Sequence, residues 1–387
     1  MKQFLAICFV MLFTTATIVP NATAAEKGLK LAEEAKSAIL IERDTGMVLF
    51  EKNSDVRLPP ASMTKIMTML LIMEELEKGN LKMQEKVRTS EYAASMGGSQ
   101  IFLEPGEEMT VEHLLQGIAI GSGNDASVAM AERVAGSEEA FVERMNKKAK
   151  QLGLKNTRFQ NTTGLPVSDH YSTAHDMAIM AKELLKYDKI TNFTGTYEAY
   201  LREDTDKKFW LVNTNRLVKF YPGVDGLKTG FTGEAKYCLT ATAKKGNMRV
   251  IAVVMGAPNP KARNAQVTKM LDFAFSQYQT HPIYKRGVDL RSVSVSKGSR
   301  KEVMGVTSEP ISVLTKKGGS IKDFTQKVEM KKNLQAPVKK GAKIGELKLL
   351  KDGRVISSSP IIASQDVKKA TWWNMYKRAF GMFTQSR

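Results

Sequence analysis

Short runs of apolar residues bounded by polar ones occur along the chain, and the first two stretches lie at 37–42 and 47–51. Short apolar runs next to a turn sequence are typical of β-strands, and the Asp-Thr-Gly sequence at 44–46 predicts a hairpin turn between them. Three more strands are expected far along the chain, at 226–231, 236–243 and 249–256. The pattern therefore predicts strands at both ends of a large N-terminal region.

The residues between these strands follow the period of a helix. Residues 61–78 come after two prolines and are apolar on almost every side, which predicts a helix in the interior of a domain. Further helices are expected at 110–120, 124–135, 138–152, 173–187 and 261–279. Distant strands with helices between them predict an α+β domain, in which one sheet packs against a helical lobe.

The pattern changes again after this domain, for which we expect the bounds 26–280. Short alternating strands broken by Lys-Gly turns predict a small all-β domain at 285–363. In the last segment, 364–387, five aromatic residues fall on one helical face: Trp372, Trp373, Tyr376, Phe380 and Phe383. A basic amphipathic helix of this kind is typical of an anchor lying in the plane of a membrane. The alternative is a helix docked on its own β domain.

The N-terminus has the form of a signal peptide. Lys2 is followed by ten apolar residues at 4–13 and by an Ala-x-Ala sequence at 22–24, so residues 1–25 are expected to be removed on export. The apolar run is half of the roughly 20 residues that span a bilayer. A buried helix or a membrane anchor is the alternative interpretation.

The excess of positive charge is concentrated near the C-terminus. The chain has 58 Lys and Arg against 40 Asp and Glu; residues 26–284 carry 34 against 32, whereas residues 285–387 carry 23 against 8. An exported protein seldom meets nucleic acid, so an anionic membrane or cell-wall surface is the expected partner. Two cysteines, Cys8 and Cys238, exclude a disulfide framework, and the four histidines lack metal-ligand spacing.

Three short motifs carry the candidate chemistry: S-x-x-K at 62–65, S-G-N at 122–124 and K-T-G at 228–230. Together they resemble the S-x-x-K, S-D-N and K-T-G signature of penicillin-binding proteins and class A β-lactamases, with Gly in place of Asp in the second motif. A second S-x-x-K, at 294–297, lies in a Lys-rich turn and is expected to be solvated surface. The first copy differs because it opens the apolar helix directly after two prolines.

Elementary chemistry supports a site at the first copy. Residues three apart on a helix are neighbours, so Lys65 can reach the hydroxyl of Ser62. A lysine with a pKa of ~10.4 becomes a base only when burial or a nearby positive charge, such as Lys228, lowers that pKa. Without the other two motifs, Ser62 would be interpreted as an ordinary helix-capping serine.

The chain resembles the serine-type D-alanyl-D-alanine carboxypeptidases, which are low-molecular-mass penicillin-binding proteins, over nearly its whole mature length. The matching segments are A-S-M-T-K at 61–65, G-S-G-N-D-A at 121–126, Y-S-T-A at 171–174, D-G-L-K-T-G at 225–230 and R-V-I-A-V-V-M-G at 249–256. The overall sequence is also similar to those of the sporulation-associated carboxypeptidases. The resemblance implies a DD-peptidase/β-lactamase-like domain, no cofactor, and acylation by β-lactams.

The resemblance also implies catalytic roles for four residues. Ser62 is expected to attack the carbonyl between the two terminal D-alanines of a peptidoglycan stem peptide, with Lys65 as its base. Ser122 is expected to relay a proton to the leaving amine, and Asn124 to hydrogen-bond the substrate amide.

Six further residues are implied to bind substrate: Lys228, Thr229, Gly230, Phe231, Arg216 and Arg263. Lys228 and Thr229 are expected to bind the C-terminal carboxylate, with Arg263 and Arg216 as further candidates. The backbone N–H groups of Ser62 and Phe231 are expected to bind the oxyanion.

The resemblance has one departure. His175 stands where the family commonly has Arg, although Asp176 is still expected to support the loop below the site. No Glu lies between 159 and 182, so a β-lactamase-like deacylating carboxylate has no candidate there. The alternatives to a carboxypeptidase are a β-lactamase, a D,D-transpeptidase, or a non-catalytic cell-wall protein. The expected location is the outer face of the cytoplasmic membrane or a forespore membrane.

Overall fold

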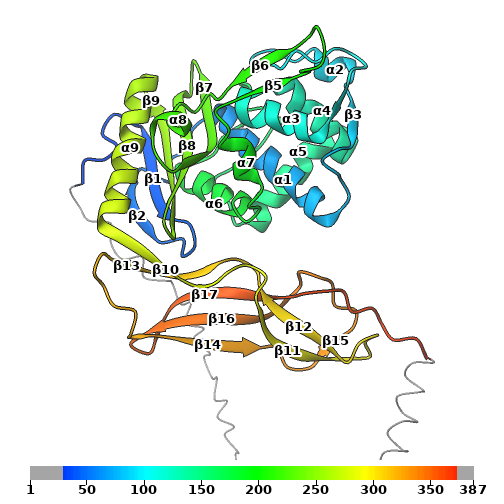
Figure 1. The fold of residues 1–387 in the computed structure, drawn as a ribbon, viewed down its shortest axis with the longest axis vertical. Coiled ribbons are helices and arrows are strands. Elements are labelled where there is room, and N and C mark those ends of the chain that lie inside the picture. Colours follow the sequence, from blue (N-terminus) through cyan, green and yellow to red (C-terminus); the bar gives the residue numbers. More distant parts are fainter. Residues whose placement is uncertain (1–28, 373–387) are drawn as a thin grey trace, which may run out of the picture.

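The computed structural model describes residues 29–372, which form an N-terminal body, called the catalytic body after the activity expected from the sequence, and a C-terminal β domain below it (Figure 1). The predicted signal peptide, residues 1–25, lies outside the described residues, as does the part of the predicted terminal helix at 373–387. In residues 29–372, no helix is long and apolar enough to cross a membrane.

The centre of the catalytic body is an antiparallel sheet with the strand order β2-β1-β9-β8-β7. Its strands are β1 (Ser37–Glu42), β2 (Val48–Lys52), β7 (Val224–Thr232), β8 (Lys236–Lys245) and β9 (Met248–Ala257). The first strand of the chain thus pairs with β9, more than 200 residues later. The predicted antiparallel sheet built from distant strands is confirmed.

Helices cover both faces of this sheet (Figure 1). Along β1, Ile39 and Ile41 enter the core shared with the helical lobe, whereas Ala38 and Leu40 enter the core beneath α9 (Pro260–Gln277). Because neither face meets water, β9 is buried along its whole length. This double burial explains why residues 250–255 of β9 are apolar without a break.

The helical lobe contains the predicted buried helix and the other expected helices. The helices of the lobe are α1 (Lys65–Lys78), α2 (Glu91–Ala94), α3 (Val111–Gln116), α4 (Asn124–Ala135), α5 (Glu138–Gln151), α6 (Ala174–Leu184) and α7 (Ile190–Thr194). A further short helix, α8 (Leu217–Phe220), lies beside the sheet. The helix predicted at 61–78 begins as a 3-10 turn, Ala61–Thr64, before α1. The helix predicted at 110–120 becomes α3 followed by a π-helical turn, Gly117–Gly121.

Several short elements were not predicted. They are the pair β3 (Lys86–Arg88) and β4 (Glu108–Thr110), the hairpin β5 (Glu198–Leu201) and β6 (Phe209–Val212), and the helices α2, α7 and α8. The helix predicted at 261–279 ends at Gln277, because β10 (Tyr278–Tyr284) pairs with β13 (Ile311–Lys316). Pairing with a distant strand overrides the local helical pattern there.

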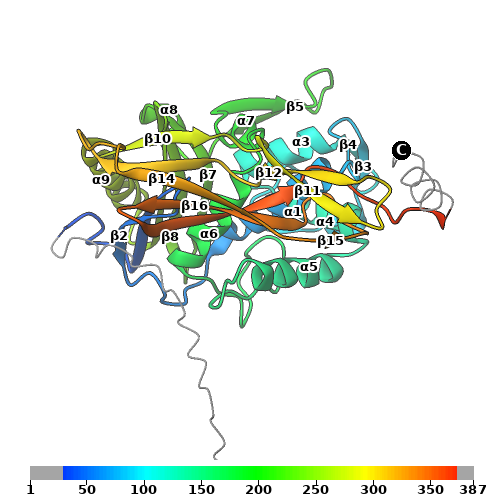
Figure 2. The ribbon, with the colours of Figure 1, turned by 90° about the horizontal axis from the view of Figure 1, so that it is seen from below.

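The C-terminal domain is all-β, as predicted. Its main sheet has the order β14-β16-β17-β12-β11-β15, from β11 (Asp289–Ser296), β12 (Glu302–Thr307), β14 (Phe324–Met330), β15 (Leu334–Gln335), β16 (Lys343–Lys351) and β17 (Arg354–Ala363). Seen from below, this sheet runs across the base of the catalytic body (Figure 2). Arg286 joins the two parts, since it pairs with Glu77 at 2.8 Å and donates to the Lys186 carbonyl.

Candidate active site

The S-x-x-K motif forms the turn from which α1 begins. The Lys65 side chain is fully buried, and its Nζ donates to Ser62 Oγ at 3.2 Å, Asn124 Oδ1 at 2.6 Å and the Thr163 carbonyl at 2.9 Å. The turn is held from outside by Gly164, where a Cβ atom would lie 1.8 Å from the Ala61 carbonyl oxygen. The structure therefore places the lysine and serine in direct contact, as the spacing predicted.

The S-G-N motif lies between the π-helical turn and α4. Ser122 has a left-handed backbone (φ 65°) and is buried, and Asn124 is the first residue of α4. The Asn124 side chain receives a hydrogen bond from Lys65 and donates from Nδ2 to the Gly97 carbonyl at 2.6 Å. Asn124 thus links the buried amine to the loop that precedes Ile101.

The K-T-G motif lies on β7, which packs against the 3-10 turn. A Cβ atom at Gly230 would lie 2.7 Å from the Pro60 carbonyl oxygen, so only glycine allows this close approach. Thr229 donates through Oγ1 to Thr214 Oγ1 at 2.7 Å. The Phe231 ring is exposed and stacks on Tyr237, with 4.4 Å between centroids.

Burial and nearby positive charges lower the pKa of both lysines. Burial first, and then the positive charge of Lys228, hold the pKa of Lys65 well below its usual range, although Asp125 opposes this effect. Burial and the nearby charge of Arg263 lower the pKa of Lys228 to about 7. The Lys65 amine can therefore exist uncharged beside the serine, which is the form that accepts a proton.

The two candidate arginines differ in their surroundings. Arg263 is buried on the first turn of α9, where Nε and Nη2 both donate to Asn264 Oδ1 at 3.0 Å, and its charge acts on Lys228. Arg216 is exposed at the start of α8 and donates to the Tyr197 hydroxyl at 2.5 Å. The structure thus brings Arg263 to the K-T-G strand and gives Arg216 a different partner.

Three supporting groups were missed by sequence reasoning: Asp125, Thr163 and Thr214. Asp125 is buried and accepts hydrogen bonds from the backbone N–H groups of Ile101 and Leu103 at 3.0–3.1 Å, which fixes the loop beside the site. An acidic residue in the first turn of α4 was the available signal. Thr163 acts through its backbone carbonyl and Thr214 through tertiary contact, so neither had a signal in the sequence.

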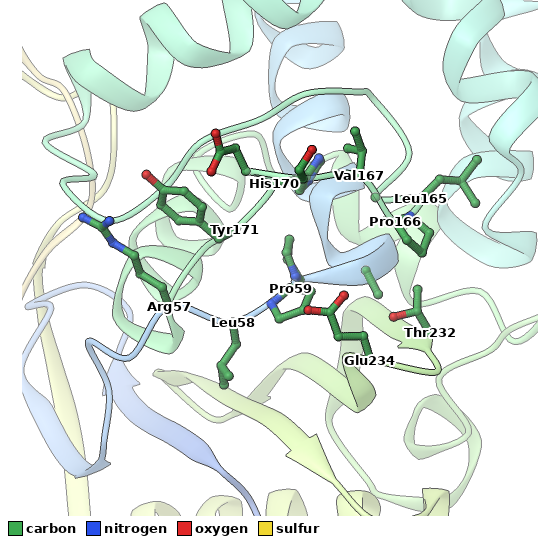
Figure 3. Close-up of a pocket in the computed structure, with 15 residues that line it drawn as sticks. Arg57, Leu58, Pro59, Leu165, Pro166, Val167, His170, Tyr171, Thr232 and Glu234 are labelled. Carbon is green, nitrogen blue, oxygen red and sulfur yellow. The ribbon is translucent and has the colours of Figure 1, made fainter.

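A cavity of about 570 Å³ opens beside the 3-10 turn that begins at Ala61 (Figure 3). The loop at 164–171 lines one side, with Leu165, Pro166 and Tyr171. Thr232, at the end of β7, and Glu234 line another.

Asp176 supports the segment that leads into this loop. It accepts hydrogen bonds from the Asn156 N–H at 3.0 Å and from the Thr157 hydroxyl at 2.8 Å, the kind of support expected from the sequence. Among the described residues, no group of three His, Cys, Asp or Glu side chains could hold a metal ion.

Comparisons with known proteins agree with this geometry. Residues 21–259 match the family model "D-alanyl-D-alanine carboxypeptidase", and residues 278–369 match "Penicillin-binding protein 5, C-terminal domain". The chain is 68% identical to D-alanyl-D-alanine carboxypeptidase DacF of Bacillus subtilis over 95% of this chain and 96% of that protein. It is 36% identical to DacA of Escherichia coli, over 88% and 85% of the two chains.

Solved structures give the same result. The structure of penicillin-binding protein 5 from Haemophilus influenzae aligns with a TM-score of 0.66 and 32% identity, over 87% of this chain and 98% of that one. The predicted family, fold and enzyme class are thus confirmed. The chain belongs to the D-alanyl-D-alanine carboxypeptidase family of penicillin-binding proteins and is a serine D,D-carboxypeptidase.

Proposed function

We propose that Ser62 and Lys65 are the nucleophile and its base in the removal of the terminal D-alanine from peptidoglycan stem peptides. The observation that carries this assignment is the buried Lys65 amine, 3.2 Å from the Ser62 hydroxyl, with its pKa lowered by burial and by Lys228. The uncharged amine accepts the hydroxyl proton as Oγ attacks the carbonyl between the two D-alanines.

The remaining groups complete the reaction. The backbone N–H groups of Ser62 and Phe231 bind the oxyanion, and loss of one such donor typically costs about 10²–10³ in rate. Ser122 passes the proton to the amine of the departing D-alanine as the C–N bond breaks. Water then hydrolyses the ester on Ser62, which restores the hydroxyl. Asn124 holds Lys65 and bonds the substrate amide by exchanging its contact with Gly97.

The C-terminal carboxylate of the substrate is assigned to Lys228, Thr229 and Arg263. Two buried cations that repel each other gain most from an anion between them, because that anion raises the pKa of Lys228 again. Gly230 keeps this strand close to the serine. Arg216 is a peripheral contributor on the exposed side of the cleft. Only a peptide end carries this carboxylate, which explains cleavage at the terminus.

The test is mass spectrometry of the penicillin adduct, together with D-alanine release from a pentapeptide. The wild type is expected to gain one adduct, and Ser62→Ala to lose both the adduct and the activity. Ser294→Ala is the matched control, because Ser294 opens the exposed second S-x-x-K sequence. An adduct that survives Ser62→Ala would refute the assignment.

A D,D-transpeptidase is the second candidate for the same site. A Streptomyces DD-transpeptidase structure is 30% identical, with a TM-score of 0.58, and covers 62% of this chain and 98% of its own. Transfer of the acyl group to an added amino acid in preference to water would favour this activity. A β-lactamase would instead turn penicillin over rapidly, and a non-catalytic cell-wall protein would retain its role in Ser62→Ala.

We also propose that the enzyme is exported and held at a membrane surface. The supports are the signal-like residues 1–25 and the basic, aromatic sequence at 364–387, flanking the domains at 26–280 and 285–363. The candidate surfaces are the outer face of the cytoplasmic membrane and, from the resemblance to sporulation-associated carboxypeptidases, a forespore membrane. A chain truncated after Trp372 should bind membranes much more weakly than the full chain; equal binding by the two chains would contradict the anchor.

A further inference from the structure

One end of the C-terminal sheet collects exposed basic side chains. Four separate segments meet there, at 297–302, 331–332, 339–340 and 366–369, with nine basic and two acidic residues between them. All nine basic side chains are exposed: Lys297, Arg300, Lys301, Lys331, Lys332, Lys339, Lys340, Lys368 and Lys369. We call this set the basic end.

The topology of the sheet brings these segments together. Four connections leave the sheet at the same end. They are the turn after β11, the connection from β14 to β15, the turn before β16 and the segment after β17. Isolated bridges join Gly298 to Lys369 and Val338 to Val367, and the Ser299 N–H donates to the Lys368 carbonyl at 2.7 Å. The cluster is therefore set by the fold, although its residues are up to 72 positions apart.

The two carboxylates within these segments are Glu302 and Asp366, and Asp366 accepts a hydrogen bond from the backbone N–H of Lys340 at 2.7 Å. The next carboxylates along the sheet pair with lysines outside the basic end. Glu329 pairs with Lys327 and with Lys348, and Glu346 pairs with Lys343. Within residues 29–372, none of the nine side chains of the basic end forms a salt bridge with a carboxylate. Holding this many like charges together costs free energy, which an anionic surface would offset.

The described chain ends at this same place. Trp372 is 71% exposed, and the chain passes from it into the final 15 residues, which contain Trp373, Tyr376, Phe380 and Phe383. In Figure 1 the basic end lies beside β15, where the red segment runs outward. Exposed tryptophan next to lysine is typical of the interface between a bilayer and water.

We propose that the basic end binds the anionic headgroups of a phospholipid bilayer, as a contact separate from the terminal segment. This contact would set the orientation of the enzyme, because only one end of the sheet carries it. The strand β16 spans about 26 Å at ~3.3 Å per residue, so the opposite end lies about three Debye lengths away at physiological salt. A surface bound at the basic end therefore barely attracts charges at the other end.

The opposite end supplies a matched control. The triple variant Lys331→Gln, Lys332→Gln, Lys339→Gln removes three charges from the basic end. The triple variant Lys317→Gln, Lys322→Gln, Arg354→Gln removes three exposed charges from the opposite end. The experiment is co-sedimentation of the full chain with vesicles of equal parts phosphatidylglycerol and phosphatidylcholine, and with phosphatidylcholine alone.

At about 1 kcal/mol for each basic residue near an anionic surface, the basic-end variant should bind the anionic vesicles on the order of 100-fold more weakly. The control variant should lose less than about threefold, and binding to phosphatidylcholine should be equal in all proteins. D-Alanine release from a soluble pentapeptide, measured without vesicles, should not change in either variant. This readout separates failure of the surface from failure of the proposed enzyme function.

Equal losses in the two variants would overturn the proposal, because net charge rather than the basic end would then drive binding. No loss in the basic-end variant would overturn it as well. A third measurement uses a polyglycerol phosphate polymer in place of vesicles. If the basic-end variant loses polymer binding while lipid binding is unchanged, the partner is an anionic wall polymer and the lipid assignment is wrong.

Discussion

Substitution of Lys228 by Met should stabilise the folded protein near neutral pH. Lys228 is 1% exposed, and its pKa falls from 10.5 to about 7 on folding. Between these two values the unfolded chain binds more protons than the native one, so the stability of the wild type rises with pH. Integrating this linkage shows that the lowered pKa of Lys228 reduces the unfolding free energy of the wild type by about 4 kcal/mol at pH 7 and by about 1 kcal/mol at pH 10.

The Met side chain has a similar length and no charge, so Lys228→Met avoids this cost. It also loses the hydrogen bond from Nζ to the Thr229 carbonyl, worth about 1 kcal/mol at any pH. The variant should therefore exceed the wild type in unfolding free energy by about 3 kcal/mol at pH 7 and by about 0 at pH 10. The stabilised variant should nevertheless bind the substrate carboxylate poorly, so stability and activity should change in opposite directions.

The assay is urea unfolding followed by far-ultraviolet circular dichroism, since all the described helices lie in the catalytic body. Lys269→Met, at an exposed position of α9, is the control and should follow the wild type at both pH values. A difference between Lys228→Met and the wild type that stays constant from pH 7 to pH 10 would refute the reasoning.

Three further predictions concern the groups around the site. Asp125→Asn removes a negative charge that raises the pKa of Lys65, so the acid limb of the rate of penicillin acylation should move to lower pH; an unchanged limb would show that Asp125 acts only on the loop. Gly230→Ala pushes a Cβ atom toward the Pro60 carbonyl, so D-alanine release should fall on the order of 100-fold while circular dichroism stays native. Burial raises the pKa of Cys238 to about 11, so iodoacetamide at pH 8 should alkylate it about 100-fold more slowly in the native protein than in urea, and equal rates would contradict its burial.

The sequence was sufficient to predict the elements whose bounds follow from local residue patterns. The prediction for β1 matches its observed bounds, Ser37–Glu42, because a short apolar run that is bounded by polar residues and followed by a turn sequence is typical of a buried strand. The same holds for α4, Asn124–Ala135, which ends in a left-handed glycine at Gly136. The three motifs pointed to the contact between Ser62 and Lys65, because residues three apart on a helix lie on the same face within reach of each other.

Tertiary structure decided everything that depends on residues far apart in the chain. The pKa of Lys65 falls because Lys228 and the surrounding core meet it in space, and the amine is held by Asn124 and by the Thr163 carbonyl. The end of α9 and the short pairs such as β5 and β6 were set by partner strands. Local patterns fix which face of an element is apolar, but contact free energies between distant segments fix which elements meet, and no single stretch of sequence carries that information.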